Sequence, residues 1–135
     1  MAKVDAAKLW SLNYRLLTSV ITSVAPEIAA LGLEIKELFV LAEIDDHPHP
    51  AELAVRLSMP KPSVTVYVKH LEAAGFVRRE IDTSDLRRHR LQVTAAGRRI
   101  MTRGLALLSD AFGARLARLS ASEQAELGAL LTKMS

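Results

Sequence analysis

The stretch from Lys61 to Arg90, KPSVTVYVKHLEAAGFVRREIDTSDLRRHR, decides the fold of this chain. In its first half, Val64, Val68 and Leu71 recur at helical spacing and predict the buried stripe of a helix. Gly75 is expected to end that helix, because glycine readily adopts the left-handed conformation found at helix C-termini. The second half of the stretch predicts two short strands.

A basic hairpin is predicted after this helix. Phe76, Val77 and Ile81 indicate the first strand, and HRLQV at residues 89–93 indicates its partner. The loop between them, IDTSDLRR, contains turn-forming residues and ends in arginines. A basic hairpin directly after a helix is the layout of a DNA-binding wing.

A shorter helix is predicted just before Lys61. It should begin at Pro50, because proline suits the first helical position, and its apolar side should carry Leu53 and Leu57. The sequence Ser58-Met59-Pro60 breaks the helical pattern. Two helices joined by a tight turn and followed by a hairpin predict a winged helix-turn-helix over residues 34–97.

The outer surface of the helix from Lys61 carries hydroxyl, aromatic and basic groups. Ser63, Thr65 and Tyr67 are candidates for contact with bases or phosphates, and Lys61 and Lys69 are candidates for contact with phosphates. For this helix taken alone, an ordinary solvated face is an equally good interpretation, because base-reading residues have no unique signature.

Charge and composition narrow the function classes. The chain has 135 residues, enough for one domain, and its 50% apolar and 4% aromatic composition favours a mostly helical protein. Residues 61–103 contain ten Lys and Arg and four acidic residues, a net +6, whereas the rest of the chain carries −3. This clustering indicates a polyanionic partner. The chain has no cysteine, which excludes disulfides, thiolate metal sites and a thiol redox switch.

Long amphipathic helices are predicted at both ends of the chain. The first covers residues 4–30, with Pro26 expected to kink or interrupt it, and another covers residues 34–44. Thr94 is expected to cap a long helix, and Ser120 with Glu123 forms a capping box for the last one. The helices at the two ends of the chain carry more apolar surface than the winged helix-turn-helix of residues 34–97 can cover. Residues 1–30 and 98–135 are therefore predicted to form a dimer interface.

Two other groups of residues have simpler interpretations. Trp10 and Tyr14 lie one turn apart and are expected to pack in a core or a dimer seam rather than to stack on a ligand. The acidic and histidine cluster from Glu43 to Glu52 contains metal-ligand types, but its spacing matches no standard zinc motif, so a plain loop without metal is predicted. The chain also lacks the phosphate-loop, zincin and nucleophile-elbow motifs, so no enzymatic activity is expected.

The run ELAVRLSMPKPSVTVYVKHLEAAGFVRREIDTSDLRRHRLQVTAAGRR resembles the central domain of the MarR family of bacterial transcriptional regulators. The matching features are Glu52-Leu53-Ala54, Val64-Thr65, Leu71-Glu72, Gly75 with Phe76-Val77-Arg78-Arg79, Asp85-Leu86-Arg87, and Val93-Thr94 with Gly97. The resemblance implies one mainly α (α+β) domain, a winged helix-turn-helix with a two-stranded wing between long dimerisation helices. It also implies a cytoplasmic homodimer that binds double-stranded DNA and has no cofactor.

The resemblance further implies particular roles at the wing. It places Arg87 in the minor groove, with Asp85 orienting the loop, while Arg88 and Arg90 are either further DNA contacts or solvated charges. The helix from Lys61 departs from the family where Val66 replaces a common basic residue, so base preference does not carry over. The resemblance implies a repressor or, less often, an activator, which a small aromatic or anionic ligand releases from its operator. A winged helix used only for protein docking is the alternative, and the +6 cluster argues against it.

No membrane association is expected, because no apolar run approaches the length that spans a bilayer. The basic and apolar residues near the N-terminus are interpreted as a structural helix and not as a signal peptide, since hydroxyl residues interrupt the apolar run between Leu16 and Val24.

Overall fold

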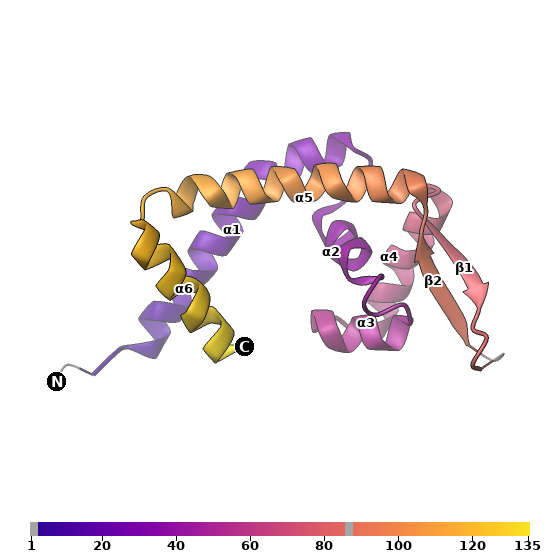
Figure 1. The fold of residues 1–135 in the computed structure, drawn as a ribbon, viewed down its shortest axis with the longest axis horizontal. Coiled ribbons are helices and arrows are strands. Elements are labelled where there is room, and N and C mark those ends of the chain that lie inside the picture. Colours follow the sequence, from indigo (N-terminus) through magenta and orange to yellow (C-terminus); the bar gives the residue numbers. More distant parts are fainter. Residues whose placement is uncertain (1–2, 86–87) are drawn as a thin grey trace. The chain divides into compact units, whose positions relative to one another are not determined.

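The computed structural model describes residues 3–85 and 88–135 of the chain. Within these residues the fold has six helices and one antiparallel hairpin (Figure 1). The elements are α1 Ala6–Ala30, α2 Ile35–Glu43, α3 Pro50–Leu57, α4 Lys61–Ala73, β1 Val77–Ile81, β2 His89–Val93, α5 Ala95–Leu116 and α6 Ala121–Met134. The predicted mainly α class with a two-stranded wing is confirmed.

The chain divides into two compact units. One unit spans Ala25–Ala106 and contains α2, α3, α4 and the hairpin, together with the end of α1 and the first half of α5. The other unit consists of the remaining parts of α1 and α5 and all of α6. No single helix of the described residues is long and apolar enough to span a membrane, and α1 with α2 would meet that test only as a bent pair.

The helix-turn-helix forms around a small apolar core. The stripe predicted for α4 is fully buried at Val64, Val68 and Leu71. It packs with Leu53 of α3 and with the apolar side of α2, where Leu38 and Leu41 are also buried. Burial of such side chains stabilises the folded state by about 1.5–3 kcal/mol each, so this core fixes the orientation of α4.

The turn between α3 and α4 is tight. Ser58 adopts a left-handed conformation with φ of 52°, and its N–H donates to the carbonyl oxygen of Val55 at 3.3 Å. Pro60 and Pro62 then flank the start of α4, which begins at Lys61 as predicted. The left-handed residue reverses the chain within three residues.

Gly75 and Thr94 set the two ends of the hairpin. Gly75 has φ of 80°, and the N–H of Phe76 donates to the carbonyl oxygen of Leu71 at 2.9 Å, which ends α4 as predicted. The register pairs Val77 with Val93 and Ile81 with His89. The Thr94 hydroxyl accepts the N–H of Gly97 at 3.0 Å and so caps α5, which confirms the predicted cap.

Of the two expectations for Pro26, the interruption of α1 is wrong, whereas the kink stays a prediction. The helix runs unbroken from Ala6 to Ala30, although Pro26 lies inside it. A proline removes one backbone hydrogen bond of a helix, and the buried side chains of Val24 and Ile28 on either side of it hold the helix by packing.

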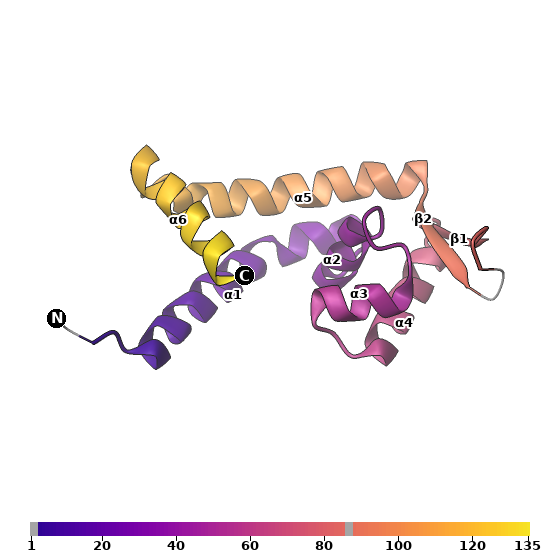
Figure 2. The same ribbon diagram turned by 60° about the horizontal axis from the view of Figure 1, so that its bottom comes forward.

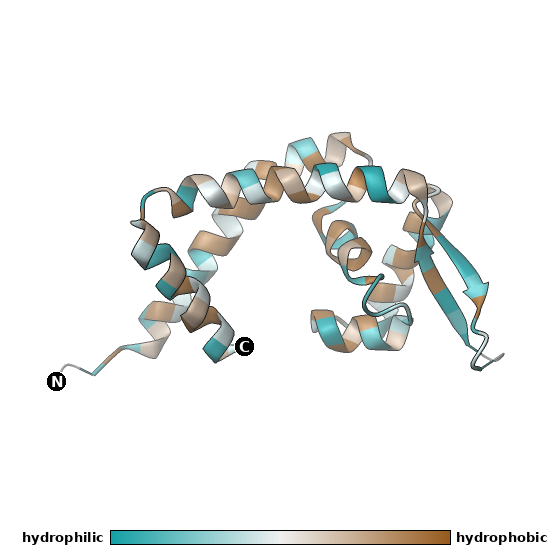
Figure 3. Cartoon of the chain, in the orientation of Figure 1, coloured by the Kyte–Doolittle hydropathy of each residue, from teal (hydrophilic) through white to brown (hydrophobic). Residues whose placement is uncertain are grey.

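The second unit leaves many apolar side chains exposed. Figure 3 shows hydrophobic residues distributed along α1 and α6. Ser120 and Glu123 make the predicted reciprocal capping box at the start of α6, but α6 buries none of its residues. Large exposed side chains on α1 and α6 include Leu9, Trp10, Leu12, Leu17, Leu130, Leu131 and Met134.

Candidate nucleic-acid interface

The outer face of α4 carries the residues predicted to contact DNA. Figure 2 shows α4 beside α3. Lys61 and Lys69 are exposed, and Ser63, Thr65 and Tyr67 are half-buried. The Thr65 hydroxyl donates to the carbonyl oxygen of Lys61 at 3.1 Å, which leaves its lone pairs and its methyl group for other contacts. The fold therefore brings all five predicted residues onto one helix whose opposite side is core.

The two lysines are not neutralised by the protein. Among the described residues, neither Lys61 nor Lys69 forms a salt bridge with a carboxylate within 4.0 Å. Their ammonium groups are available to external anions. His70 of the same helix differs, because its Nδ1 lies 3.5 Å from Oε2 of the buried Glu37 and so turns toward α2.

The basic residues at the base of the hairpin are paired within the fold. Arg79 donates to Glu72 at 2.8 Å, and Arg78 contacts Gln92 at 2.7 Å and Glu80 at 3.2 Å. These arginines brace β1 against α4 and β2. They are therefore weaker candidates for DNA contact than the residues of the loop.

The loop of the wing is described only in part. Asp85 lies just before the gap, and its carbonyl oxygen accepts the N–H of Arg88 at 2.9 Å. Arg87, the arginine predicted to enter the minor groove, lies outside the described residues. Arg88 is half exposed, and its guanidinium lies 3.6 Å from Glu52 of α3.

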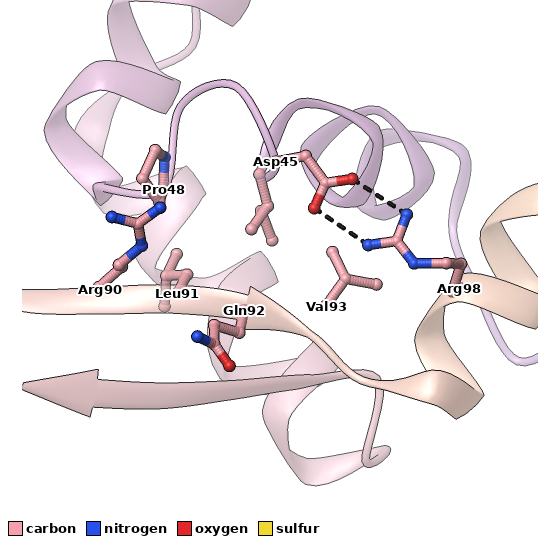
Figure 4. Close-up of a pocket in the computed structure, with 8 residues that line it drawn as sticks. Asp45, Pro48, Arg90, Leu91, Gln92, Val93 and Arg98 are labelled. Carbon is pink, nitrogen blue, oxygen red and sulfur yellow. Dashed lines mark hydrogen bonds and ion pairs between the residues drawn. The ribbon is translucent and has the colours of Figure 1, made fainter.

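Arg90 is exposed on β2 and forms part of a shallow pocket of about 230 Å³ beside the loop before α3 (Figure 4). Arg98 and Asp45 also line this pocket. The Arg98 guanidinium donates to both carboxylate oxygens of Asp45, at 3.0 and 3.1 Å. These hydrogen bonds raise the pKa of Arg98 above its ordinary value. Among the described residues that line the pocket, Arg90 is thus the cation without an ion-pair partner.

A contact that the sequence did not reveal joins the wing to α3. His49 directly precedes α3, and its Nε2 lies 3.2 Å from Oδ2 of Asp82, just after β1. The N–H of Leu91 in β2 donates to the carbonyl oxygen of Pro48 at 2.8 Å. Residues 33 positions apart in sequence carry no local signal for this pairing, which depends on the tertiary fold.

Asp82 is held as a carboxylate at this junction. Its Oδ1 accepts the Ser84 hydroxyl at 2.6 Å and the Ser84 N–H at 2.9 Å. These hydrogen bonds, helped by the positive charges of His49 and Arg88 and opposed by burial, lower the pKa of Asp82 below its ordinary value.

The acidic and histidine cluster before α3 is divided among separate partners. Asp45 binds Arg98, Glu43 lies 3.6 Å from Arg56, and His49 contacts Asp82. Across residues 3–85 and 88–135, no three histidine or acidic side chains come together in a group that could hold a metal ion.

The two helices α3 and α4 with the hairpin that follows them define the class: this is a winged helix-turn-helix protein, and the lysines of α4 have no carboxylate partner among the described residues. A model described as the MarR family matches residues 31–88. The chain is 32% identical over 136 residues to the HTH-type transcriptional repressor Rv2887 of Mycobacterium tuberculosis, a match that covers 99% of this chain and 98% of that protein. The chain belongs to the MarR family of transcriptional regulators.

Solved structures of a MarR family protein have folds similar to that of this chain. The crystal structure of the M. tuberculosis MarR family protein Rv2887 in complex with DNA has a TM-score of 0.77 at 28% identity, covering 98% of this chain and 99% of that one. The complex of Rv2887 with p-aminosalicylic acid has a TM-score of 0.75 at 31% identity and covers 93% and 97% of the two chains.

Proposed function

We propose that this protein is a homodimeric, sequence-specific DNA-binding repressor that acts in the cytoplasm. The observation that carries the proposal is the outer face of α4, where Lys61 and Lys69 lack carboxylate partners within the described residues while the inner face is wholly buried. A relative of nearly equal length is named as a repressor, and its complex with DNA has the same fold. Both support the proposal.

The contacts divide by chemistry. Lys61 and Lys69 bind phosphates, because an ammonium group is a point charge without a base-reading pattern. Ser63, Thr65 and Tyr67 meet base edges or phosphates when α4 enters the major groove. Each lies on the half-buried part of the face, where the helix backbone holds it in place.

The wing supplies the second set of contacts. Arg87 enters the minor groove and Asp85 orients the loop, a proposal that rests on the sequence motif because Arg87 lies outside the described residues. Arg90 is exposed and contacts the DNA backbone. Arg88 contributes less, because Glu52 already lies 3.6 Å from its guanidinium.

The terminal helices form the dimer. Their exposed leucines, with Trp10 and Met134, are more apolar surface than an isolated chain leaves in water. A two-fold dimer with two reading helices requires an operator that is an inverted repeat, with half-site centres about 10 bp apart. Both features follow from the same symmetry.

A small aromatic anion releases the repressor from its operator. The support is the complex of the related Rv2887 with p-aminosalicylic acid, a molecule of this chemical class. In this chain an anionic ligand would be attracted to residues 61–103, which carry a net charge of +6.

Selection of bound sequences from random duplex DNA tests the proposal. The expected result is an enriched dyad, bound with an affinity that falls steeply as salt is raised, because counterions are released from the phosphates. The double variant Lys61→Ala with Lys69→Ala should have a clearly smaller salt dependence, because two phosphate contacts are lost from each protomer. Enrichment of no sequence, together with salt-independent binding, would favour the protein-docking alternative.

A further inference from the structure

His49 stands between two hydrogen-bond acceptors of the wing. Its Nε2 lies 3.2 Å from the carboxylate of Asp82, and its Nδ1 lies 3.3 Å from the carbonyl oxygen of His89. The side chain of His49 is only 14% exposed and that of Asp82 only 7%, so water competes little for either. The two acceptors come from opposite sides of the hairpin loop: Asp82 follows the end of β1, and His89 is the first residue of β2.

This arrangement fixes the protonation state that satisfies it. A carbonyl oxygen and a carboxylate only accept hydrogen bonds, whereas a neutral imidazole carries one N–H and one bare nitrogen. Only the imidazolium can donate to both partners at once. A neutral His49 would therefore leave one ring nitrogen facing an acceptor without a proton between them.

The contact between His49 and Asp82 lies where the wing meets the segment before α3, inside the unit that spans Ala25–Ala106. The neighbouring Pro48 carbonyl accepts the N–H of Leu91 from the outer edge of β2, and Arg88 reaches Glu52 of α3. The segment before α3 thus contacts β2 and the residue that follows β1, and Figure 1 shows this segment beside β2. Several residues form ion pairs in or with this segment. Among those that the structure describes, only Asp82 has a more buried side chain than His49.

We infer that His49 is a positioning residue whose protonated ring clamps the wing onto the start of α3 and so holds it in the orientation that binds DNA. The DNA part of this inference rests on the proposed function, whereas the clamp is a property of the protein alone. Loss of one ring proton would break one of the two hydrogen bonds and loosen the wing.

Several charged groups surround His49. Asp82 contacts it from the end of β1, and Arg88 from the wing loop lies near Asp82. Nearby in the chain, His47 of the preceding loop has its Nδ1 4.0 Å from Glu52 of α3. The lowered pKa of Asp82 keeps the carboxylate charged under mildly acidic conditions. With Asp82 charged, the clamp is complete when the His49 ring carries both of its N–H groups.

The variant His49→Gln tests the clamp. Glutamine can donate to Asp82 but cannot carry the charge, and the His49 side chain makes no capping bond to α3 that the substitution would remove. His47→Gln is the matched control, because His47 lies two residues away and touches a carboxylate of α3 but not the hairpin.

The first measurement is operator affinity from pH 5.5 to 8.5 at constant ionic strength, for the wild type and both variants. The wild type should bind roughly tenfold more tightly at the acidic end than His49→Gln, the scale of one charge-assisted hydrogen bond, and the two curves should converge at the alkaline end. His47→Gln should follow the wild type. A constant ratio of wild type to His49→Gln across the pH range, or no difference at all, would overturn the inference.

The second measurement needs no DNA. Hydrogen exchange at the Leu91 amide, which bonds Pro48, should speed up in His49→Gln relative to the amides of the β1–β2 ladder. Faster exchange with no binding to any duplex would support the clamp and refute the proposed function. Unchanged exchange of Leu91 would refute the clamp whether or not DNA binds.

Discussion

The backbone carbonyl of Phe76 occupies the position where a Cβ atom on Gly97 would have to lie. The same carbonyl oxygen accepts the N–H of Thr94 at 3.0 Å, and Thr94 in turn donates its hydroxyl to the carbonyl oxygen of Gly75 at 2.6 Å. The first turn of α5 is thereby seated directly on the beginning of the hairpin.

Gly97→Ala should destabilise the unit that spans Ala25–Ala106. The added methyl group meets backbone and not a flexible side chain, so α5 or β1 has to shift, a change that costs about 1–3 kcal/mol of unfolding free energy. Gly113→Ala is the control in the same helix, since nothing lies within 4 Å of its added Cβ, and it should stabilise by about 0.5–1 kcal/mol. Urea unfolding of both variants measures the difference, and equal shifts would contradict the close contact.

Lys69 and Thr65 should affect DNA binding differently. Lys69→Ala should weaken binding to all duplexes alike and lower the salt slope by about two for the dimer, because it removes one phosphate contact from each protomer. Thr65→Val keeps the branched shape but loses the hydroxyl, and should change the preference among sequences. Titration of both variants against a panel of operator variants measures this, and indistinguishable effects would show that the roles are misassigned.

Arg87→Ala should cost about 1–3 kcal/mol of operator binding with little change in thermal stability. Arg87→Lys should recover part of the loss, because an ammonium lacks the planar fork of donors, and Asp85→Ala should resemble a milder Arg87→Ala. Arg78→Ala is the matched control in the same hairpin, where Gln92 and Glu80 already engage the guanidinium. Full affinity in Arg87→Ala would remove the wing tip from the mechanism.

Leu12→Glu should convert the dimer into monomers and abolish operator binding. Leu12 is 50% exposed on α1, so a carboxylate there is harmless to the isolated chain but costly within an apolar interface. Val55→Glu makes the same chemical change at an exposed apolar residue of α3 and should leave the dimer intact. Sedimentation at micromolar concentration distinguishes the two, and a monomeric wild type would refute the dimer itself.

The carboxyl of Asp82 should titrate below the ordinary range of aspartates. Its pKa is lower in the folded state, so its contribution to stability is present above the unfolded value, about pH 4, and is lost as the pH falls through the folded value. The Ser84 hydroxyl is the largest cause, so Ser84→Ala should move the pKa back upward. A carbon-detected NMR titration of Asp82 in both proteins checks the shift, which would be refuted by identical curves.

Local patterns in the sequence predicted most of the fold. The stripe of Val64, Val68 and Leu71, the glycine at residue 75 and the Ser120 capping box act within a few residues, so each element formed where the sequence placed it. Pro26 failed as a predictor of interruption, because flanking buried side chains hold α1 through it.

The predicted residues of the reading face all lie on α4, since helical periodicity alone sets their direction. The wing was harder to anticipate. Contacts between His49 and Asp82, and between Arg88 and Glu52, join segments that meet only after the core has formed. The histidine before α3 was noticed in the sequence as a metal-ligand type, whereas the structure gives it a carboxylate and a carbonyl as partners.

Trp10 stacks on Tyr14 with ring centroids 6.1 Å apart and is 65% exposed on α1. It is the single tryptophan of the chain, so the intrinsic fluorescence of the protein reports on one place. An indole in water emits at longer wavelength than one in an apolar seam, and a nearby phenol can transfer excitation to it. Dilution of the protein below the dissociation constant of the dimer should therefore shift the emission of Trp10 to the red. This shift would give a label-free optical readout of dimer formation.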